Sequence, residues 1–266
     1  MDELLFQKIL LVEDTLINQE VAKLMLEDYC TTIDIAENGQ EAIDKLQQTD
    51  YQLILMDCLM PVMDGYTATK TIRELSDPTK SKTPIIAVTA SVTLECQKKC
   101  KESGMSDYLT KPFSQEKLEK MLRKWSPMHQ SSAPVTPSPT NSTQSSASDD
   151  TSSSNAVDIA KFEQLQKILG QRFQQFIKNY IQESESKLDQ LVTAGETCST
   201  SDMERLVHSL KSGAANLGCK EMTEYAQHLE DKYRSGDANN ASDEFDKINT
   251  MFEEVKQSLH ELIDEK

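Results

Sequence analysis

Three carboxylate side chains stand directly after predicted strands of this 266-residue chain. Glu13 and Asp14 follow the apolar run KILLV, and Asp57 follows LILM. If both runs are strands of one parallel sheet, the carboxylates meet at its carboxyl edge, where such sheets bind ligands. Clustered carboxylates repel one another unless a cation lies between them, and their hard oxygen atoms favour Mg²⁺. A site of this kind can present one carboxylate as a nucleophile to phosphorus.

Two further polar side chains end or directly follow predicted strands in the same part of the chain. Thr89 ends the run PIIAVT, and Lys111 directly follows DYLT. A lysine at this edge would balance, together with the metal, the charge on a transferring phosphoryl group. We therefore expect both residues to lie beside the carboxylates.

A histidine in the second half of the chain is the other candidate for chemistry. Ser201 and Glu204 form a capping-box pattern, which predicts the start of a helix that Gly218 ends. The apolar stripe of this helix consists of Met203, Leu206, Val207, Leu210, Ala214 and Leu217. His208 and Lys211 lie well away from that stripe, so we expect His208 to face outward, accessible to a second protein. Lys211, one turn further on, would offer positive charge to a phosphoryl group on the imidazole.

The elements that would carry these residues divide the chain into three segments. Residues 1–125 contain five strand–helix repeats, which predict a parallel sheet with helices on both faces. Residues 126–156 are rich in Ser, Thr and Pro and lack aromatic residues, so we expect a disordered linker. Residues 157–266 show only helical patterns, which predict a helical bundle.

Composition excludes several classes of function. The formal net charge of -16 repels the phosphates of nucleic acids and anionic lipids, so we expect no nucleic-acid partner. No apolar run approaches the length of a membrane span, and the acidic N-terminus is unlike a signal peptide. We expect a cytoplasmic chain without direct membrane insertion, although a longer parent protein could carry a membrane anchor.

The first segment closely resembles the receiver domain of response regulators, and more narrowly the receivers fused to hybrid sensor kinases. The resemblance rests on LVEDTLINQEVA, LMDCLMPVMDGYTAT, TPIIAVTA and GMSDYLTKPF, in that order. It implies a flavodoxin-like, doubly wound (βα)5 fold. It also implies that Asp57 is the phosphoacceptor and that Asp14, Asp57 and the backbone carbonyl of Leu59 bind Mg²⁺, with Glu13 acting mainly through a water.

The same resemblance assigns roles to three residues outside the metal site. Lys111 would contact the phosphoryl oxygens, and Thr89 would donate its hydroxyl to them. Tyr108 matches the switch aromatic of the family, whose orientation follows Thr89. One departure is Thr15, since hybrid receivers often carry Asn beside the metal ligands.

The last segment resembles the histidine phosphotransfer (HPt) domain, a four-helix bundle, through HSLKSGAANLG. The resemblance implies that His208 is phosphorylated. The small residues Ser212, Gly213, Ala214 and Ala215 would let another domain approach the imidazole closely. Ser212 is a departure, because the family commonly has Gly directly after the lysine.

Together, the two resemblances indicate a two-component phosphorelay protein. Asp57 would accept a phosphoryl group from a sensor histidine kinase, and His208 would pass it to a downstream response-regulator receiver; transfer in reverse is equally consistent. Two alternatives stay open. The chain could be the C-terminal part of a hybrid histidine kinase, an enzyme whose ATP site lies upstream, or an adaptor in which His208 is idle. The sequence identifies neither the input signal, the donor, the output nor the oligomeric state.

Overall fold

The computed structural model describes residues 4–89, 93–111, 113–127, 156–197 and 199–264; most of the predicted linker lies outside these ranges. Five strands form one sheet in the order β2-β1-β3-β4-β5, and all four neighbouring pairs are parallel. The strands are β1 (Phe6–Val12), β2 (Cys30–Ala36), β3 (Leu53–Asp57), β4 (Ile85–Thr89) and β5 (Asp107–Thr110). The predicted doubly wound parallel sheet is confirmed.

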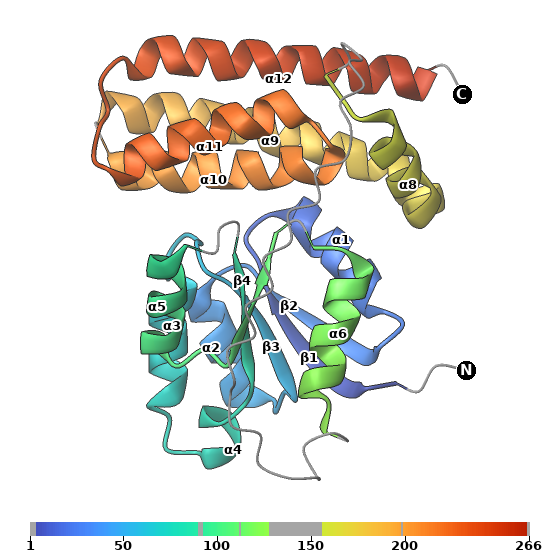
Figure 1. The fold of residues 1–266 in the computed structure, drawn as a ribbon, viewed down its shortest axis with the longest axis vertical. Coiled ribbons are helices and arrows are strands. Elements are labelled where there is room, and N and C mark those ends of the chain that lie inside the picture. The colour runs from blue at the N-terminus through green and yellow to red at the C-terminus, as the bar shows by residue number, and fades with distance from the viewer. Residues whose placement is uncertain (1–3, 90–92, 112, 128–155, 198, 265–266) are drawn as a thin grey trace.

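In the described part of the receiver half, the helices beside this sheet are α1 (Leu16–Leu26), α2 (Gly39–Gln48), α3 (Gly65–Arg73), α4 (Pro78–Ser81), α5 (Leu94–Ser103) and α6 (Gln115–Trp125). Helices α1 and α6 cover one face, and α2, α3 and α5 lie on the other (Figure 1). Alternation along β1 explains the two layers. Ile9 and Leu11 pack with α1 and α6, whereas Leu10 and Val12 pack with α2 and α3. The strands β3 and β4 are buried at every residue, which explains their nearly continuous apolar sequence.

The second half is helical, as predicted. Its elements are α8 (Ile159–Leu169), a 3₁₀ turn (Gly170–Arg172), α9 (Phe173–Glu196), α10 (Thr200–Leu217), α11 (Lys220–Arg234) and α12 (Ala241–Asp264). Helix α10 packs against α9 and α11, and α12 packs against the same two helices, which closes a four-helix bundle. The whole predicted apolar stripe of α10 is buried in the core of this bundle.

The start of α10 differs from the prediction. The helix begins at Thr200 with Ser199 as N-cap, and the Ser199 hydroxyl lies 2.5 Å from Asp202 Oδ2. The predicted capping box is wrong because Glu204 accepts a hydrogen bond from Arg234 Nε at 2.8 Å instead of folding back on the helix start. The predicted end is correct: Gly218 adopts the left-handed conformation, with φ 76°.

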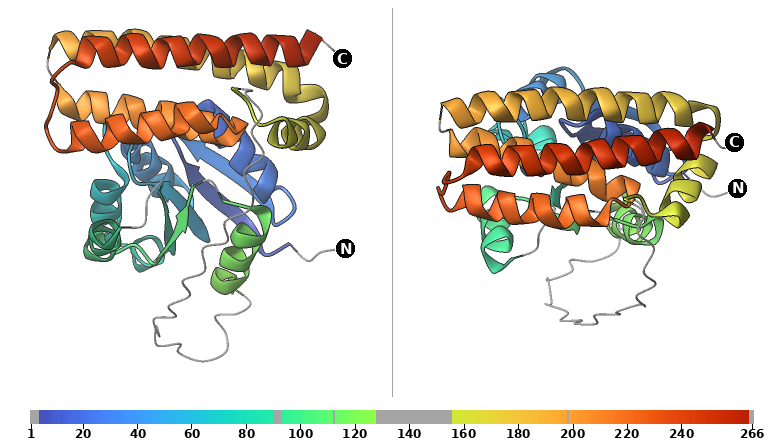
Figure 2. Two further views of the ribbon diagram at one scale, coloured as in Figure 1. Left: turned by 45° about the horizontal axis from the view of Figure 1, so that its top comes forward. Right: turned by 90° about the horizontal axis from the view of Figure 1, so that it is seen from above.

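The bundle lies over the carboxyl edge of the sheet, with α9 and α10 nearest to α1 (Figures 1 and 2). Ile17 of α1 is 1% exposed and belongs to the bundle core, and Val21 and Leu24 pack against that core. The same edge carries the residues for which the sequence predicts chemistry. Within the described ranges, none of the helices has the length and apolarity needed to span a membrane.

Candidate functional site

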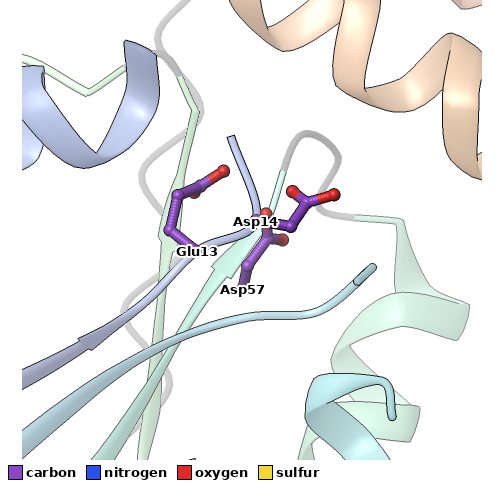
Figure 3. A group of neighbouring side chains, drawn as sticks. All are labelled: Glu13, Asp14 and Asp57. Carbon is purple, nitrogen blue, oxygen red and sulfur yellow. The ribbon is translucent and has the colours of Figure 1, made fainter. Parts of the chain in front are cut away.

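The three predicted carboxylates meet at the carboxyl edge of the sheet (Figure 3). Glu13 and Asp14 follow β1, and Asp57 ends β3, the strand paired directly with β1. Ligand oxygens of the three lie within 4.8 Å of one another. Glu13 and Asp57 are 3% and 1% exposed, so their charges face one another with little water between them. This donor set fits a hard divalent cation held by oxygen ligands.

Lys111 lies in the middle of this cluster, as the sequence predicts. Its Nζ donates to Asp57 Oδ2 at 2.7 Å and to Glu13 Oε2 at 2.5 Å. Burial by itself lowers the pKa of Lys111, but the carboxylates of Asp57 and Glu13 outweigh burial and raise it. Burial also raises the pKa of Glu13 to about 8; Lys111 opposes this, and Asp57 and Asp14 add to it. The raised pKa of Glu13 means that burial and repulsion from the other carboxyl groups outweigh the charge of Lys111.

Thr89 and Leu59 also lie at this edge, whereas Tyr108 is an exposed residue of β5. The Thr89 hydroxyl is 3.5 Å from Cys96 Sγ, and the backbone N–H of Leu59 donates to Asp57 Oδ1 at 3.2 Å. Leu59 and Thr89 line a cavity of about 600 Å³. Tyr108 is 39% exposed, so its ring lies at the surface.

His208 lines the same cavity from the bundle side, together with Glu230. Its Nδ1 lies 3.1 Å from Glu230 Oε1. Its Nε2 is buried and has no hydrogen-bond partner among the residues that the structure describes. If Nδ1 carries the proton and donates to Glu230, the lone pair of Nε2 is left free as a nucleophile.

The expectation that His208 is solvent-exposed is wrong. The side chain does lie off the apolar stripe of α10, but the residue is only 4% exposed because the receiver edge covers it. The pKa of Asp14 also reflects how close the bundle lies to the receiver edge. Burial raises the pKa of Asp14, Asp57 adds to this, and the charges of Lys187, Lys111 and His208 oppose it.

Lys211 also differs from the prediction. It is 4% exposed, and its Nζ is bonded to a Glu230 carboxylate oxygen and, at 2.9 Å, to Gln227 Oε1. Its charge is therefore paired with Glu230 instead of standing free beside the imidazole. Burial alone would raise the pKa of Glu230, but the hydrogen bond and charge of His208, with the charge of Lys211, hold it at about 2.

The small residues 212–215, which follow Lys211, face two different surroundings: the receiver and the interior of the bundle. Ser212 and Ala215 line a cavity that Glu13 and Lys111 line from the receiver side. Gly213 instead faces its own bundle, where an added Cβ would lie 3.1 Å from the Tyr180 ring. Ala214 is fully buried in the bundle core. The expectation that all four lower the docking surface is correct for Ser212 and Ala215 and wrong for the other two.

Sequence reasoning missed Glu230. It lies on α11, 22 residues after His208, and no local pattern links the two. It also missed the polar residues between the halves, among them Lys187 and Ser209. The one sequence signal for Glu230 and Lys187 is that each is a charged residue within the apolar pattern of its helix.

Comparison with known proteins identifies a family for each half of the chain. The family "Response regulator receiver domain" matches residues 9–123, and the family "Hpt domain" matches residues 175–258. The chain is a receiver domain followed by an Hpt domain. Its homologues are hybrid histidine kinases, and the receiver–Hpt pair belongs to two-component phosphorelay signalling.

Two relatives show the extent of this similarity. Hybrid signal transduction histidine kinase B of Dictyostelium discoideum is 41% identical over 128 residues, covering 44% of this chain and 6% of that protein. Signal transduction histidine-protein kinase BarA of Escherichia coli is 30% identical over 264 residues, covering 97% of this chain and 26% of that protein. The receiver–Hpt chain thus spans about a quarter or less of the length of these relatives.

Two solved structures each resemble a little under half of this chain. One is the receiver domain of a sensor histidine kinase from Pseudomonas aeruginosa, solved with a magnesium ion in its active-site cleft: 39% identity, TM-score 0.42, 45% of this chain and 97% of that chain. Another comes from a Saccharomyces cerevisiae complex of a histidine phosphotransfer protein with the receiver domain of its downstream response regulator. It is 32% identical, with a TM-score of 0.43, and the match covers 47% of this chain and 91% of that chain.

Proposed function

We propose that this receiver–Hpt chain carries a phosphoryl group on Asp57 and on His208 in turn. The observation that carries the proposal is Nε2 of His208, which has no hydrogen-bond partner among the described residues. His208 lines a cavity together with Cys58, Leu59 and Thr89, and Cys58 directly follows Asp57. Because Nδ1 is bonded to Glu230, Nε2 is the ring nitrogen whose lone pair can attack phosphorus.

The first step transfers the group to the receiver. A carboxylate oxygen of Asp57 attacks the phosphorus of a donor phosphohistidine, the P–N bond breaks, and the donor imidazole keeps the electron pair. Lys111, already 2.7 Å from Asp57 Oδ2, neutralises charge on the phosphoryl oxygens, and the Thr89 hydroxyl donates to them. Tyr108 would change orientation with Thr89.

We propose that Glu13, Asp14, Asp57 and the carbonyl of Leu59 hold Mg²⁺. The support is the donor set itself: three carboxyl groups have ligand oxygens within 4.8 Å of one another, and Lys111 bonds two of them. The ion would supply charge neutralisation during phosphoryl transfer. Glu13, whose Oε1 accepts from Asn18 Nδ2 at 2.7 Å, would act through a water.

The second step moves the group to the Hpt domain. Nε2 of His208 attacks the phosphorus of the Asp57 acyl phosphate, the P–O bond breaks, and the Asp57 carboxylate is regenerated. Glu230 holds the imidazole by its other nitrogen, and Lys211 stabilises the Glu230 carboxylate. A sensor histidine kinase would be the donor, and a downstream receiver the final acceptor. This fits a chain that corresponds to the receiver and Hpt portions of a longer hybrid kinase.

Chemical stability of the phosphorylated chain tests the proposal. Incubation with a small acyl phosphate and Mg²⁺ should give a base-labile phosphate on Asp57 and then a base-stable phosphate on His208. Asp57→Asn should abolish both, and His208→Gln should abolish only the base-stable product. A base-stable phosphate that survives His208→Gln would contradict the assignment, as would labelling that Asp57→Asn leaves unchanged.

A further inference from the structure

Thr15 uses its hydroxyl in an unusual way. It is the N-cap residue of α1, where a threonine ordinarily accepts a hydrogen bond from its own helix, but here it makes no such bond. Its hydroxyl instead lies 3.2 Å from Asp14 Oδ1, 2.7 Å from Ser209 Oγ and 3.2 Å from Lys187 Nζ. Thr15 is 2% exposed, so these bonds are made away from water.

The donors and acceptors of this group fit one arrangement. Lys187 of α9 donates to Glu183 Oε1 at 2.5 Å, to Thr15 and to Ser209 of α10. With the lysine supplying three protons, the Ser209 hydroxyl is free to donate to Thr15, and Thr15 to Asp14. A chain of hydrogen bonds thus runs from the Hpt helices to an acidic residue of the receiver.

A second chain of the same kind reaches Glu13. Asn216 of α10 donates from Nδ2 to Asn18 Oδ1 at 2.6 Å, and Asn18 donates from Nδ2 to Glu13 Oε1 at 2.7 Å. The Hpt domain therefore contacts each acidic residue after β1 through one intervening receiver side chain.

The polar and apolar parts of this interface do different work. Ile17, Val21 and Leu24 supply apolar area that any receiver with a similar α1 could offer. The buried polar pairs discriminate between receivers, because a receiver without the matching group leaves a desolvated donor or acceptor of the Hpt domain unpaired. Such mismatches reject a wrong partner more strongly than a missing methylene does.

We propose that Lys187 and Ser209 select the receiver that this Hpt domain accepts, by requiring a short hydroxyl side chain at the position of Thr15. In the same way, Asn216 requires an amide side chain at the position of Asn18. The preferred partner is then this chain's own receiver, or another receiver with the same two side chains. Lys187 is a specificity-determining residue that positions the two domains and does not touch the phosphoryl group. The inference rests on the proposed transfer from Asp57 to His208.

A double-mutant cycle on the full chain tests this selection. After a pulse of acyl phosphate and Mg²⁺, the rate at which base-stable phosphate appears is measured for Lys187→Met, Thr15→Val and the double variant. Each single variant should slow transfer about tenfold, the effect of losing one hydrogen bond to a charged group. The double variant should also be slowed about tenfold, because both changes break the same chain of hydrogen bonds between Asp14 and the Hpt helices. Lys178→Met, an exposed lysine on the same helix, is the matched control and should transfer like the unchanged chain.

Two measurements separate selection from general damage. In the His208→Gln background, Lys187→Met should leave the rate of base-labile labelling of Asp57 unchanged, and thermal unfolding should stay close to that of the parent. Ser209→Ala should reproduce the slowed transfer. Transfer by Lys187→Met within twofold of the unchanged chain would overturn the inference while leaving the proposed function intact, and so would a double variant slowed about a hundredfold. If the unchanged chain forms no base-stable phosphate, the proposed function fails, and the inference with it.

Discussion

Replacing Glu230 with glutamine removes one negative charge from the buried group that holds His208. Glu230 is 1% exposed and is bonded to His208 Nδ1, Lys211 Nζ and Arg234 Nη2. Its pKa is about 2, against an ordinary value of 4.5. At about 1.4 kcal/mol for each pH unit, the ionised carboxylate stabilises the fold by about 3 kcal/mol at neutral pH. Glu230→Gln should therefore lower the free energy of unfolding by about that amount.

The sign of the pH dependence follows from the lowered pKa. A carboxyl group whose pKa is depressed in the folded state contributes stability that is fully present above its unfolded pKa and is lost as the pH falls through its folded pKa. The difference in unfolding free energy between the unchanged chain and Glu230→Gln should be largest near pH 7. It should shrink by about 2 kcal/mol by about pH 3.

Urea unfolding of the full chain measures this difference with two probes. Helical circular dichroism reports both domains, whereas the fluorescence of Trp125, the single tryptophan, reports α6 of the receiver. Glu230→Gln should shift the dichroism transition more than the fluorescence transition. Glu224→Gln, an exposed glutamate on the same helix, should shift neither. A difference that does not change between pH 7 and pH 3 would refute the electrostatic reasoning.

Two other perturbations give direct outcomes. Mg²⁺ at about one hundred times its dissociation constant should stabilise the receiver by about 2.7 kcal/mol in thermal unfolding; Asp14→Asn should reduce this stabilisation, and equal stabilisation of both proteins would argue against Asp14 as a ligand. Gly65→Ala should destabilise the receiver by about 2 kcal/mol or more, because the added Cβ would lie 2.0 Å from the backbone oxygen of Asp57; unfolding unchanged from the parent would show that the loop after β3 can move aside.

Most of the receiver half was predictable from local sequence patterns. Glu13, Asp14, Asp57 and Lys111 each follow or end a strand, and parallel strands bring their carboxyl ends to one edge. Their meeting point thus follows from local patterns and one topological rule. The apolar stripe of α10 was predictable for a similar reason, because the helical period fixes which side chains share a face.

The surroundings of His208 depend on the packing of the two domains and could not be predicted from its sequence neighbours. The helical period places the imidazole off the core stripe, but it cannot reveal that a second domain covers that face and buries the residue to 4%. Nor can it show that Lys211 pairs with Glu230, or that Thr15 meets Ser209 across 194 positions of sequence. Such contacts depend on the packing of separate elements, whose side chains carry no mutual signal in the sequence. The acidic site was therefore predictable from sequence, whereas its fit to the Hpt domain emerged only from the folded structure.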